Sequence, residues 1–401
     1  MVGPPPESIL EGLYTRKGGG VPAGRVTAGA CMVASVLRVY DPVTGRLSDV
    51  EVRDRMSVYV CGITPYDSAH LGHAFTYVHF DVLVRYLRYL GADVVHVQNV
   101  TDVDDDILRV ARERRVDFRE LAEWEIAMFE RDMSAIGVGK PTRSPRATEF
   151  IPQIIEDVSK LVDAGVGYER GGWVYFRVRA DPGYGRLSGL DREDMVKLAD
   201  ERGGHPEDPN RDDPLDFVLW QRSAPDEPSW ESPWGPGRPG WHIECSVMSS
   251  RLCGLPIDVH GGGSDLVFPH HECELAQAGN LPGDRPFVRH WMHTGEVFQD
   301  GEKMSKSLGN MTFVSDLLER YPPASIRRFL LSHHYRREWE WKGEITEPGW
   351  AGFGVESRRD AFFAMLDHDL QAGLALRWLE EADAAGEDWV EDGREILGLN
   401  L

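Results

Sequence analysis

The chain has 401 residues, of which 41% are hydrophobic and 12 are tryptophans. This length and composition exclude a mostly disordered protein and allow two to three domains, each with its own core. The formal net charge of −22 removes the diffuse basic surface that supports most nucleic-acid binding, and no apolar run is long enough to span a membrane. Five cysteines form an odd, sparse set, which indicates a reducing compartment. We therefore expect a cytoplasmic protein that binds neither DNA nor a membrane.

The N-terminal segment 1–34 is rich in glycine and proline and lacks the apolar block of a signal peptide. We expect it to be a flexible tail. Met32 stands just before the first expected strand, at 35–40, and is therefore a second candidate for the native start.

The next segments predict a parallel sheet. The apolar run 57–60 predicts a strand, 74–90 a helix that ends at Gly91, and 94–97 another strand. Strand, helix and strand at this spacing form a βαβ unit, so the expected fold class is α/β.

Further helices are predicted at 117–133, where Asp117 opens a capping box, and at 148–164, which carries one apolar face. Residues 173–178 are strand-like, and 181–240, rich in Gly, Pro and Asp, predict a loop-dominated insertion.

The second half returns to α/β character. Residues 257–260 predict a buried strand that runs into three glycines, and Pro269 suits the first turn of a helix through Gln277. We expect the chain after Ser307 to be mostly helical.

Two histidines and two lysines, far apart in the sequence, predict one nucleotide site. His70 and His73 stand between a strand end and a helix start, where a parallel sheet binds ligands and a helix N-terminus attracts anions. Taken alone, they are equally well explained as loop histidines. Lys303 and Lys306, flanked by serines at 305 and 307, offer mobile charges and hydroxyls to phosphate oxygens. Together the motifs predict that ATP is held while a carboxylate attacks its α-phosphate, which is adenylation.

Two loops have weaker interpretations. The glycines at 261–263 allow backbone amides to approach a ligand, and Asp265 suits a ribose or adenine group. A tight turn explains three glycines equally well. The acidic run 102–106 is interpreted as a solvated loop rather than a cation site.

Cys61, Cys245, His270 and Glu274 form a candidate metal set. His270 and Glu274 are four residues apart and so share one face of a helix. Two thiolates, an imidazole and a carboxylate suit zinc. Buried cysteines are also ordinary small core residues, and the sequence alone leaves both interpretations open. His260 and His271 are alternative ligands, and the remaining thiols are interpreted as core or surface residues: Cys31, Cys253 and Cys273.

In this order the motifs resemble the cysteine-activating branch of class I aminoacyl-tRNA synthetases over about residues 36–340. The resemblance rests on seven blocks, which are Tyr59-Val60-Cys61-Gly62, His70-Leu71-Gly72-His73, Asn99-Val100-Thr101-Asp102, Gly237 to Cys245, Gly261 to Leu266, Phe268 to Glu272, and Lys303-Met304-Ser305-Lys306-Ser307. It implies a Rossmann-type class I catalytic core at 35–310, with an insertion at about 109–236. A helical stem-contact region and a truncated helical domain follow at 311–401.

The resemblance also implies the roles of the site residues. Zinc would bind the four residues of the metal set and also the thiolate of the substrate cysteine. Serine would be rejected because its hydroxyl is a poorer zinc ligand than a thiolate. With ATP and Mg²⁺ as cofactors, phosphate charge would be stabilised by His70, His73, Lys303 and Lys306. The remaining contacts to ATP and cysteine would come from Gly62, Thr64, Gly72, Thr101, Trp241, Gly261, Gly262, Gly263, Ser264, Asp265, Met304, Ser305 and Ser307.

The acceptor of the activated cysteine is predicted from finer similarities. Segments 63–67, 201–216 and 334–341 resemble the mycothiol-pathway cysteine ligase, which transfers cysteine to the amine of glucosaminyl-inositol. The acidic segment 342–401 is short for an anticodon-reading domain. Glu274 and segment 307–310 instead resemble cysteinyl-tRNA synthetase. We expect a monomeric glucosaminyl-inositol ligase, with tRNA as the alternative acceptor; a non-catalytic paralogue is disfavoured by the intact histidine and lysine motifs.

Overall fold

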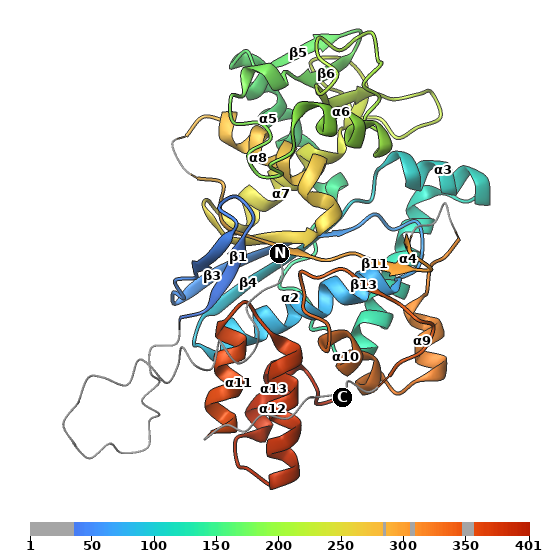
Figure 1. Ribbon diagram of the computed structural model, residues 1–401. Helices are drawn as coiled ribbons and strands as arrows, with labels where there is room; N and C mark the ends of the chain where they lie inside the picture. The colour runs from blue at the N-terminus through green and yellow to red at the C-terminus, as the bar shows by residue number, and fades with distance from the viewer. Residues whose placement is uncertain (1–35, 284–285, 305–308, 347–356) are drawn as a thin grey trace, which may run out of the picture.

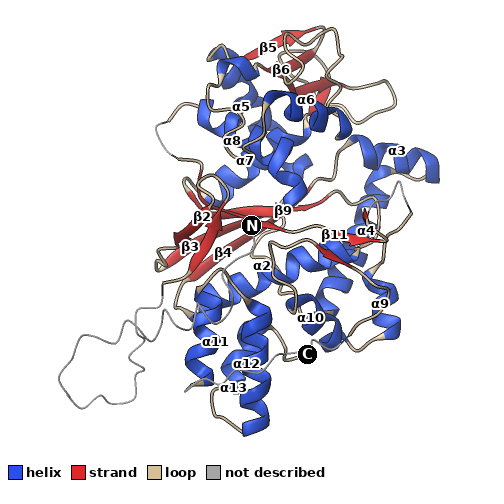
Figure 2. Ribbon diagram, in the orientation of Figure 1, coloured by secondary structure: helices blue, strands red, loops and turns tan. Residues whose placement is uncertain are grey.

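The structure is a computed structural model, and it describes residues 36–283, 286–304, 309–346 and 357–401. Its centre is a parallel sheet of order β10-β9-β3-β4 (Figure 2). The strands of this sheet are β3 (Arg55–Ile63), β4 (Asp93–Val100), β9 (Ile257–Gly263) and β10 (Val288–Thr294). The expected α/β class with a Rossmann-type core is confirmed.

Helices cover both faces of this sheet, as a parallel sheet requires. Helix α2 (Leu71–Tyr89) connects β3 to β4 and packs on one face, as predicted, while α7 (Trp241–Cys253) packs on the other (Figure 1). Strands β3 and β4 are longer than the strands predicted at 57–60 and 94–97, because polar residues near their ends, such as Asn99, are buried as well.

A second sheet corrects the expectation of a loop-dominated segment at 181–240. Part of this antiparallel sheet, of order β5-β6-β7-β8, lies in that segment, as does α6 (Arg192–Glu201). Its strands are β5 (Gly167–Arg170), β6 (Trp173–Phe176), β7 (Phe217–Arg222) and β8 (Gly237–Pro239). These strands are short and separated by Gly- and Pro-rich turns, so the alternation of apolar and polar residues along them is hard to recognise in the sequence. Trp220 on β7 is fully buried, which shows that this sheet has a core of its own.

Smaller elements complete the fold. A hairpin joins β1 (Arg38–Asp41) to β2 (Arg46–Asp49), and a three-stranded sheet contains β11 (Val297–Gln299), β12 (Glu302–Lys303) and β13 (Trp339–Glu340). The other helices are α3 (Asp105–Arg114), α4 (Phe118–Ala135), η1 (Ala147–Phe150), α5 (Ile151–Asp163), η2 (Val178–Ala180), η3 (Ser264–Leu266), η4 (Val267–His271), α8 (Glu272–Asn280), α9 (Val314–Arg320), α10 (Pro323–Leu331), α11 (Arg358–Asp367), α12 (Ala372–Ala385) and α13 (Val390–Leu397).

Within the described residues, no helix is both long and apolar enough to cross a membrane.

The region after 311 is mostly helical, as expected, and α11, α12 and α13 pack below the sheet near α2 (Figure 1). The division into a tail, a catalytic domain with an insertion and a C-terminal helical domain stays a prediction, and its tail, 1–34, lies outside the described residues.

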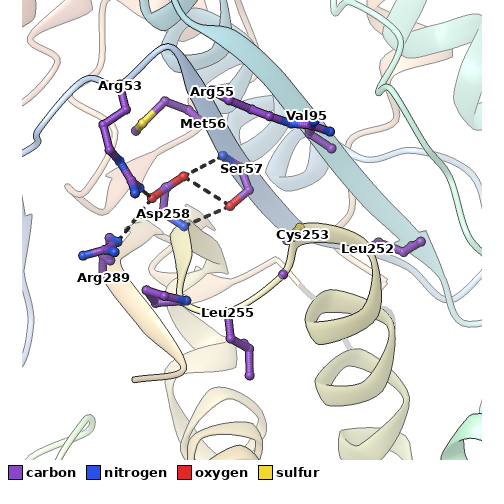
Figure 3. A pocket seen from close by; sticks show the side chains of 12 residues that line it. Arg53, Arg55, Met56, Ser57, Val95, Leu252, Cys253, Leu255, Asp258 and Arg289 are labelled. Carbon is purple, nitrogen blue, oxygen red and sulfur yellow. Dashed lines mark hydrogen bonds and ion pairs between the residues drawn. The ribbon is translucent and has the colours of Figure 1, made fainter. Parts of the chain in front are cut away.

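At the amino-terminal edge of the parallel sheet, Asp258 ties β9 to β3. The backbone N–H of Ser57 donates to Asp258 Oδ2 at 2.8 Å, and Arg53 and Arg289 form ion pairs with the same carboxylate (Figure 3). A cavity of about 370 Å³ opens beside these side chains. It lies at the opposite end of β3 from Cys61.

Arg327 joins the C-terminal helices to the catalytic core. Its guanidinium, fully buried, donates to Asp81 Oδ2 on α2 at 2.5 Å, to the Leu397 carbonyl at 2.6 Å and to the Ile136 carbonyl at 3.2 Å. A buried charge is tolerated only when it is paired and hydrogen-bonded in this way.

Replacing this guanidinium should destabilise the fold strongly. Arg327→Ala leaves the Leu397 and Ile136 carbonyls without their buried donor and leaves Asp81 with only the partly exposed Arg85 as a cation, so we expect a loss of about 3–5 kcal/mol in the free energy of unfolding. The neighbouring Arg328, 41% exposed, pairs with Glu380 at 3.4 Å at the surface, so Arg328→Ala should cost about 0–1 kcal/mol. Urea unfolding followed by circular dichroism measures both; equal losses would show that Arg327 is not a structural anchor.

Candidate active site

The register of two strands creates the site. In the parallel pair, Tyr59 lies opposite His260 and Val60 opposite Gly261, which brings Cys61 on β3 beside the glycine segment of β9. A Cβ on Gly261 would lie 1.7 Å from the Met292 carbonyl oxygen on β10. Strand packing therefore requires a glycine there, whether or not a ligand approaches it.

The four predicted metal-binding residues come together. One donor atom from each of Cys61, Cys245, His270 and Glu274 lies within 4.8 Å of every other, and all four residues are buried. Glu274 Oε1 is 3.6 Å from Cys61 Sγ and 3.2 Å from His270 Nε2. Such a set of two sulfurs, one nitrogen and one oxygen around a common point matches the donors of a tetrahedral metal site.

The structure also assembles the alternative ligands. Cys61, His260, His271 and Glu274 satisfy the same 4.8 Å limit. His260 Nε2 is 2.9 Å from Glu274 Oε2, and His271 Nε2 is 3.3 Å from Cys61 Sγ. The two sets share Cys61 and Glu274, so they are two ways of using one buried centre.

Local structure differs from expectation at two of these positions. Cys245 lies inside α7 rather than at the start of a segment. The helix expected from Pro269 is instead the π-turn η4 followed by α8. His270 and His271 are consecutive in this π-turn, and both are buried.

A second layer of histidines was missed by the sequence analysis. His242 Nδ1 is 2.9 Å from His270 Nδ1, and His293 Nε2 is 2.8 Å from His271 Nδ1. His242 stands three residues before a predicted ligand, Cys245, which is a signal that could have identified it. His293 has no local signal because only sheet pairing brings it to Gly262.

Burial controls the protonation of this centre. It lowers the pKa of His270 and His271 well below the usual value, and neighbouring imidazoles lower it further. It raises the pKa of the Cys61 thiol, with added contributions from Cys245 and Glu274. Neutral imidazoles are the form that binds a metal, whereas the thiols need a cation nearby before they ionise.

His70 and His73 lie at the start of α2, as predicted. His70 is the N-cap, and its Nδ1 accepts the backbone N–H of His73 at 3.3 Å. The two rings stack with centroids 3.7 Å apart, and a Cβ on Gly72 would come within 3.0 Å of the His70 ring. The glycine thus leaves space for two stacked imidazoles at a helix N-terminus, where anions are favoured.

Backbone pairing connects the two motifs that are far apart in sequence. Leu71 N–H donates to the Thr312 carbonyl, and Val314 N–H donates to the Ala69 carbonyl, both at 2.9 Å. Lys303 Nζ lies 2.9 Å from Glu296 Oε1 and 3.4 Å from Asp265 Oδ2, so it reaches the glycine segment. Met304 is buried. The other predicted residues of this loop, Ser305, Lys306 and Ser307, lie outside the described residues.

The predicted substrate contacts lie at or just after the carboxyl ends of β3, β4 and β9 and at the start of α7. Trp241, 36% exposed, stands at the start of α7 with its ring 4.3 Å from that of His270. Thr101, at the end of β4, is buried and accepts from Asn99 Nδ2 at 3.3 Å. Gly62 and Thr64 follow Cys61 directly; a Cβ on Gly62 would lie 1.6 Å from the Asn99 carbonyl oxygen. Ser264 begins the turn η3.

The acidic loop is more structured than expected. Asp102 accepts from the backbone N–H of Thr148 at 3.0 Å and from its hydroxyl at 2.5 Å, while Asp104 caps α3 by accepting from Asp106 N–H at 2.8 Å. On helix α7, Glu244 is buried as well. Burial raises the pKa of the Glu244 carboxyl, the neighbouring Cys245, Asp104 and Asp102 raise it further, and the Thr101 hydroxyl lowers it.

Comparison with known proteins places this geometry in a family. Residues 48–348 match the catalytic domain of class I (C) tRNA synthetases. The chain is 46% identical over 375 residues to the L-cysteine:1D-myo-inositol 2-amino-2-deoxy-alpha-D-glucopyranoside ligase of Thermomonospora curvata, with 88% of this chain and 89% of the relative covered. It is 48% identical over 324 residues to the cysteine–tRNA ligase of Syntrophobacter fumaroxidans, with 80% of this chain and 64% of that relative covered.

The fold comparison agrees. Mycobacterium tuberculosis methionyl-tRNA synthetase, solved in complex with methionyl-adenylate, superposes with a TM-score of 0.57 at 16% identity, covering 86% of this chain and 88% of the other. This likeness concerns the fold alone. The matched catalytic domain and the two similar ligases show that the chain belongs to the family of class I (C) tRNA synthetase catalytic domains and is an ATP-dependent ligase.

Proposed function

We propose that the protein activates L-cysteine with ATP and Mg²⁺, giving cysteinyl-adenylate and pyrophosphate, and transfers the cysteinyl group to the amine of glucosaminyl-inositol in mycothiol biosynthesis. The observation that carries the first half is the buried centre of Cys61, Cys245, His270 and Glu274. It lies at the same edge of the sheet as the stacked His70 and His73. Relatives with either acceptor are cysteine ligases, which agrees with cysteine as the activated acid.

The residues present fit a zinc ion. Two thiolates and an imidazole are soft and borderline donors that favour Zn²⁺ over Mg²⁺, and the buried carboxylate adds a fourth. Cys245 belongs to only one of the two possible ligand sets, and a second sulfur favours that set for zinc. Zinc, when bound, would supply a Lewis acid that holds the substrate thiolate and rejects serine. His242 then orients the imidazole of His270 through its other ring nitrogen.

The roles of the nucleotide residues follow from charge and position. His70 and His73 at the N-terminus of α2 would contact the phosphates, and Lys303 with Lys306 would stabilise the charge that develops as pyrophosphate leaves. The contact of Lys303 with Asp265 holds its ammonium near the glycine segment, where the nucleoside would lie. Met304 and the flanking serines would shape the loop around the triphosphate.

The choice of acceptor rests on charge. Residues 357–401 contain 11 acidic and 4 basic residues. Three of these arginines form ion pairs, Arg358 with Glu387, Arg377 with Glu381 and Arg394 with Asp383. Such a surface repels a phosphodiester backbone, whereas a small sugar amine needs no basic surface. Transfer to tRNA, the activity named for the Syntrophobacter relative, is the second candidate.

The metal ligands can be tested with a matched pair of cysteines on one helix. Cys245→Ser should lower zinc content at least tenfold, because a hydroxyl is a poor zinc ligand. Cys253→Ser, on the same helix α7 but outside the donor cluster, should retain zinc. Metal analysis of purified protein gives the content. Loss of zinc from His271→Asn but not from His270→Asn would instead favour the alternative ligand set.

Adenylation can be tested by cysteine-dependent exchange between ATP and pyrophosphate. Lys306→Ala should lower the exchange rate by about 10²–10³-fold, since one preorganised charge at the transition state is removed. Its zinc content should not change. Arg320→Ala, on the surface of α9, serves as the control. Absence of exchange by the zinc-loaded unsubstituted protein would refute the proposed chemistry.

The acceptor can be tested by competition. Enzyme supplied with cysteine, ATP and both acceptors in equal amounts should consume glucosaminyl-inositol and leave tRNA uncharged. Mass spectrometry of the sugar product and acid-precipitable labelled cysteine on tRNA measure the two outcomes. Charging of tRNA alone would identify the protein as a cysteine–tRNA ligase.

A further inference from the structure

Glu244 is a buried carboxylate without a hydrogen-bonded partner. Its residue is 1% exposed, and within the described part of the chain neither carboxylate oxygen makes a hydrogen bond of normal geometry. Burial raises the pKa of this carboxyl well above its usual value, and the Thr101 hydroxyl lowers it. An isolated carboxylate in such a place costs several kcal/mol, so proteins rarely keep one without a use for it.

The other charged groups nearby are engaged elsewhere. Asp102 receives both hydrogen bonds of Thr148, and Asp104 caps α3. The buried cation Arg238, six residues before Glu244, pairs with Asp105 and lies 3.5 Å from Glu227. No described arginine or lysine is recorded in an ion pair with Glu244. Among these acids, Glu244 is the one that has neither an ion pair nor a hydrogen-bond donor of normal geometry in the described chain.

Its neighbours place Glu244 beside the metal centre. Glu244 directly precedes Cys245 on α7, and α7 packs against β3, which carries Cys61, and against β4, which Thr101 follows. Thr101 Oγ1 accepts from Asn99, whose Oδ1 in turn accepts the Gly62 N–H at 2.8 Å. Because its oxygen already accepts this bond, the Thr101 hydroxyl proton is available to donate toward the carboxylate.

We propose that Glu244 binds the α-ammonium group of the substrate cysteine and thereby selects an amino acid over other thiols. This inference rests on the proposed function, in which the metal holds the cysteine thiolate at Cys61 and Cys245. In cysteine, two carbon atoms separate the sulfur from the nitrogen. A thiolate held at Cys245 therefore leaves its ammonium within reach of the neighbouring carboxylate. The ammonium supplies the missing cation, and Glu244 acts as a positioning and specificity residue.

The first experiment uses the protein without substitution. Zinc is replaced by Co²⁺, and the sulfur-to-cobalt charge-transfer absorption is followed while L-cysteine or 3-mercaptopropionate is added without ATP. Both probes carry a thiol and a carboxylate, but 3-mercaptopropionate has no amine. Cysteine should bind about 10- to 100-fold more tightly, which corresponds to one charge-assisted hydrogen bond. Equal affinities would overturn the proposal.

The second experiment removes the charge. In Glu244→Gln, the KM for cysteine in ATP–pyrophosphate exchange should rise about 10- to 100-fold, while the KM for ATP stays unchanged. In the Co²⁺ protein the preference for cysteine over 3-mercaptopropionate should disappear. Glu156→Gln, a surface glutamate on α5, is the matched control and should keep the preference.

The outcomes separate this inference from the function on which it rests. Exchange by the unsubstituted protein together with full cysteine preference in Glu244→Gln overturns the role of Glu244 alone. Absence of both exchange and thiol binding in the unsubstituted protein overturns the proposed function. If Glu244→Gln loses its metal or fails to fold, Glu244→Asp, which keeps the charge, takes its place and should retain part of the cysteine preference. Equal affinities of the two thiols for the unsubstituted protein overturn the proposal in either case.

Discussion

The parallel pairing of β3 with β9 is the constraint on which the site depends. It places the chain around Cys61 against the glycines of β9, while β4 and β10 flank the pair on either side. The approach is so close that a side chain on Gly62 or Gly261 would meet a backbone carbonyl of the flanking strand. Because all four strands point the same way, their carboxyl ends deliver Cys61, Thr101 and His293 to one edge.

The second constraint is a short stretch of backbone pairing far from the sheet centre. Residues 69–71, which lead into α2, bond to residues 312–314, which follow the lysine loop. This pairing holds the start of the histidine helix beside the strand region of Lys303. Positioning of this kind matters for phosphoryl chemistry, where the protein contributes mainly fixed charges. Arg327 performs a similar joining role on the other side of α2, where it anchors α13 to the core.

Burying so many polar side chains in one centre costs free energy of folding unless a bound cation satisfies them. Four imidazoles, at positions 242, 260, 270 and 271, lie together with two thiols and with Glu274, and burial lowers the pKa of three of these imidazoles. The hydrogen bonds among them satisfy only part of their capacity, since His260 Nδ1 has no recorded partner in the described chain. A cation at the shared point of Cys61 and Glu274 would resolve this, so we expect the local stability of the site to depend on metal. The π-turn η4 carries two consecutive histidines of this centre, and both are buried.

Much of this protein could be predicted from residue order alone. The apolar runs and turn residues predicted the βαβ unit. The histidine motif at 70–73 and the lysine motif at 303–307 indicated a nucleotide site only in combination, because together they offer imidazole and ammonium groups to phosphate oxygens. The pattern also identified Cys61, Cys245, His270 and Glu274 as possible metal ligands. It left open whether they converge, because four residues from three separate segments meet only through sheet register and helix packing. The tertiary structure alone decided that convergence, turned the Gly- and Pro-rich segment into a second sheet, and revealed His242, His293 and Glu244. Their importance comes from contacts between elements, and contacts between elements leave no periodic trace in a sequence.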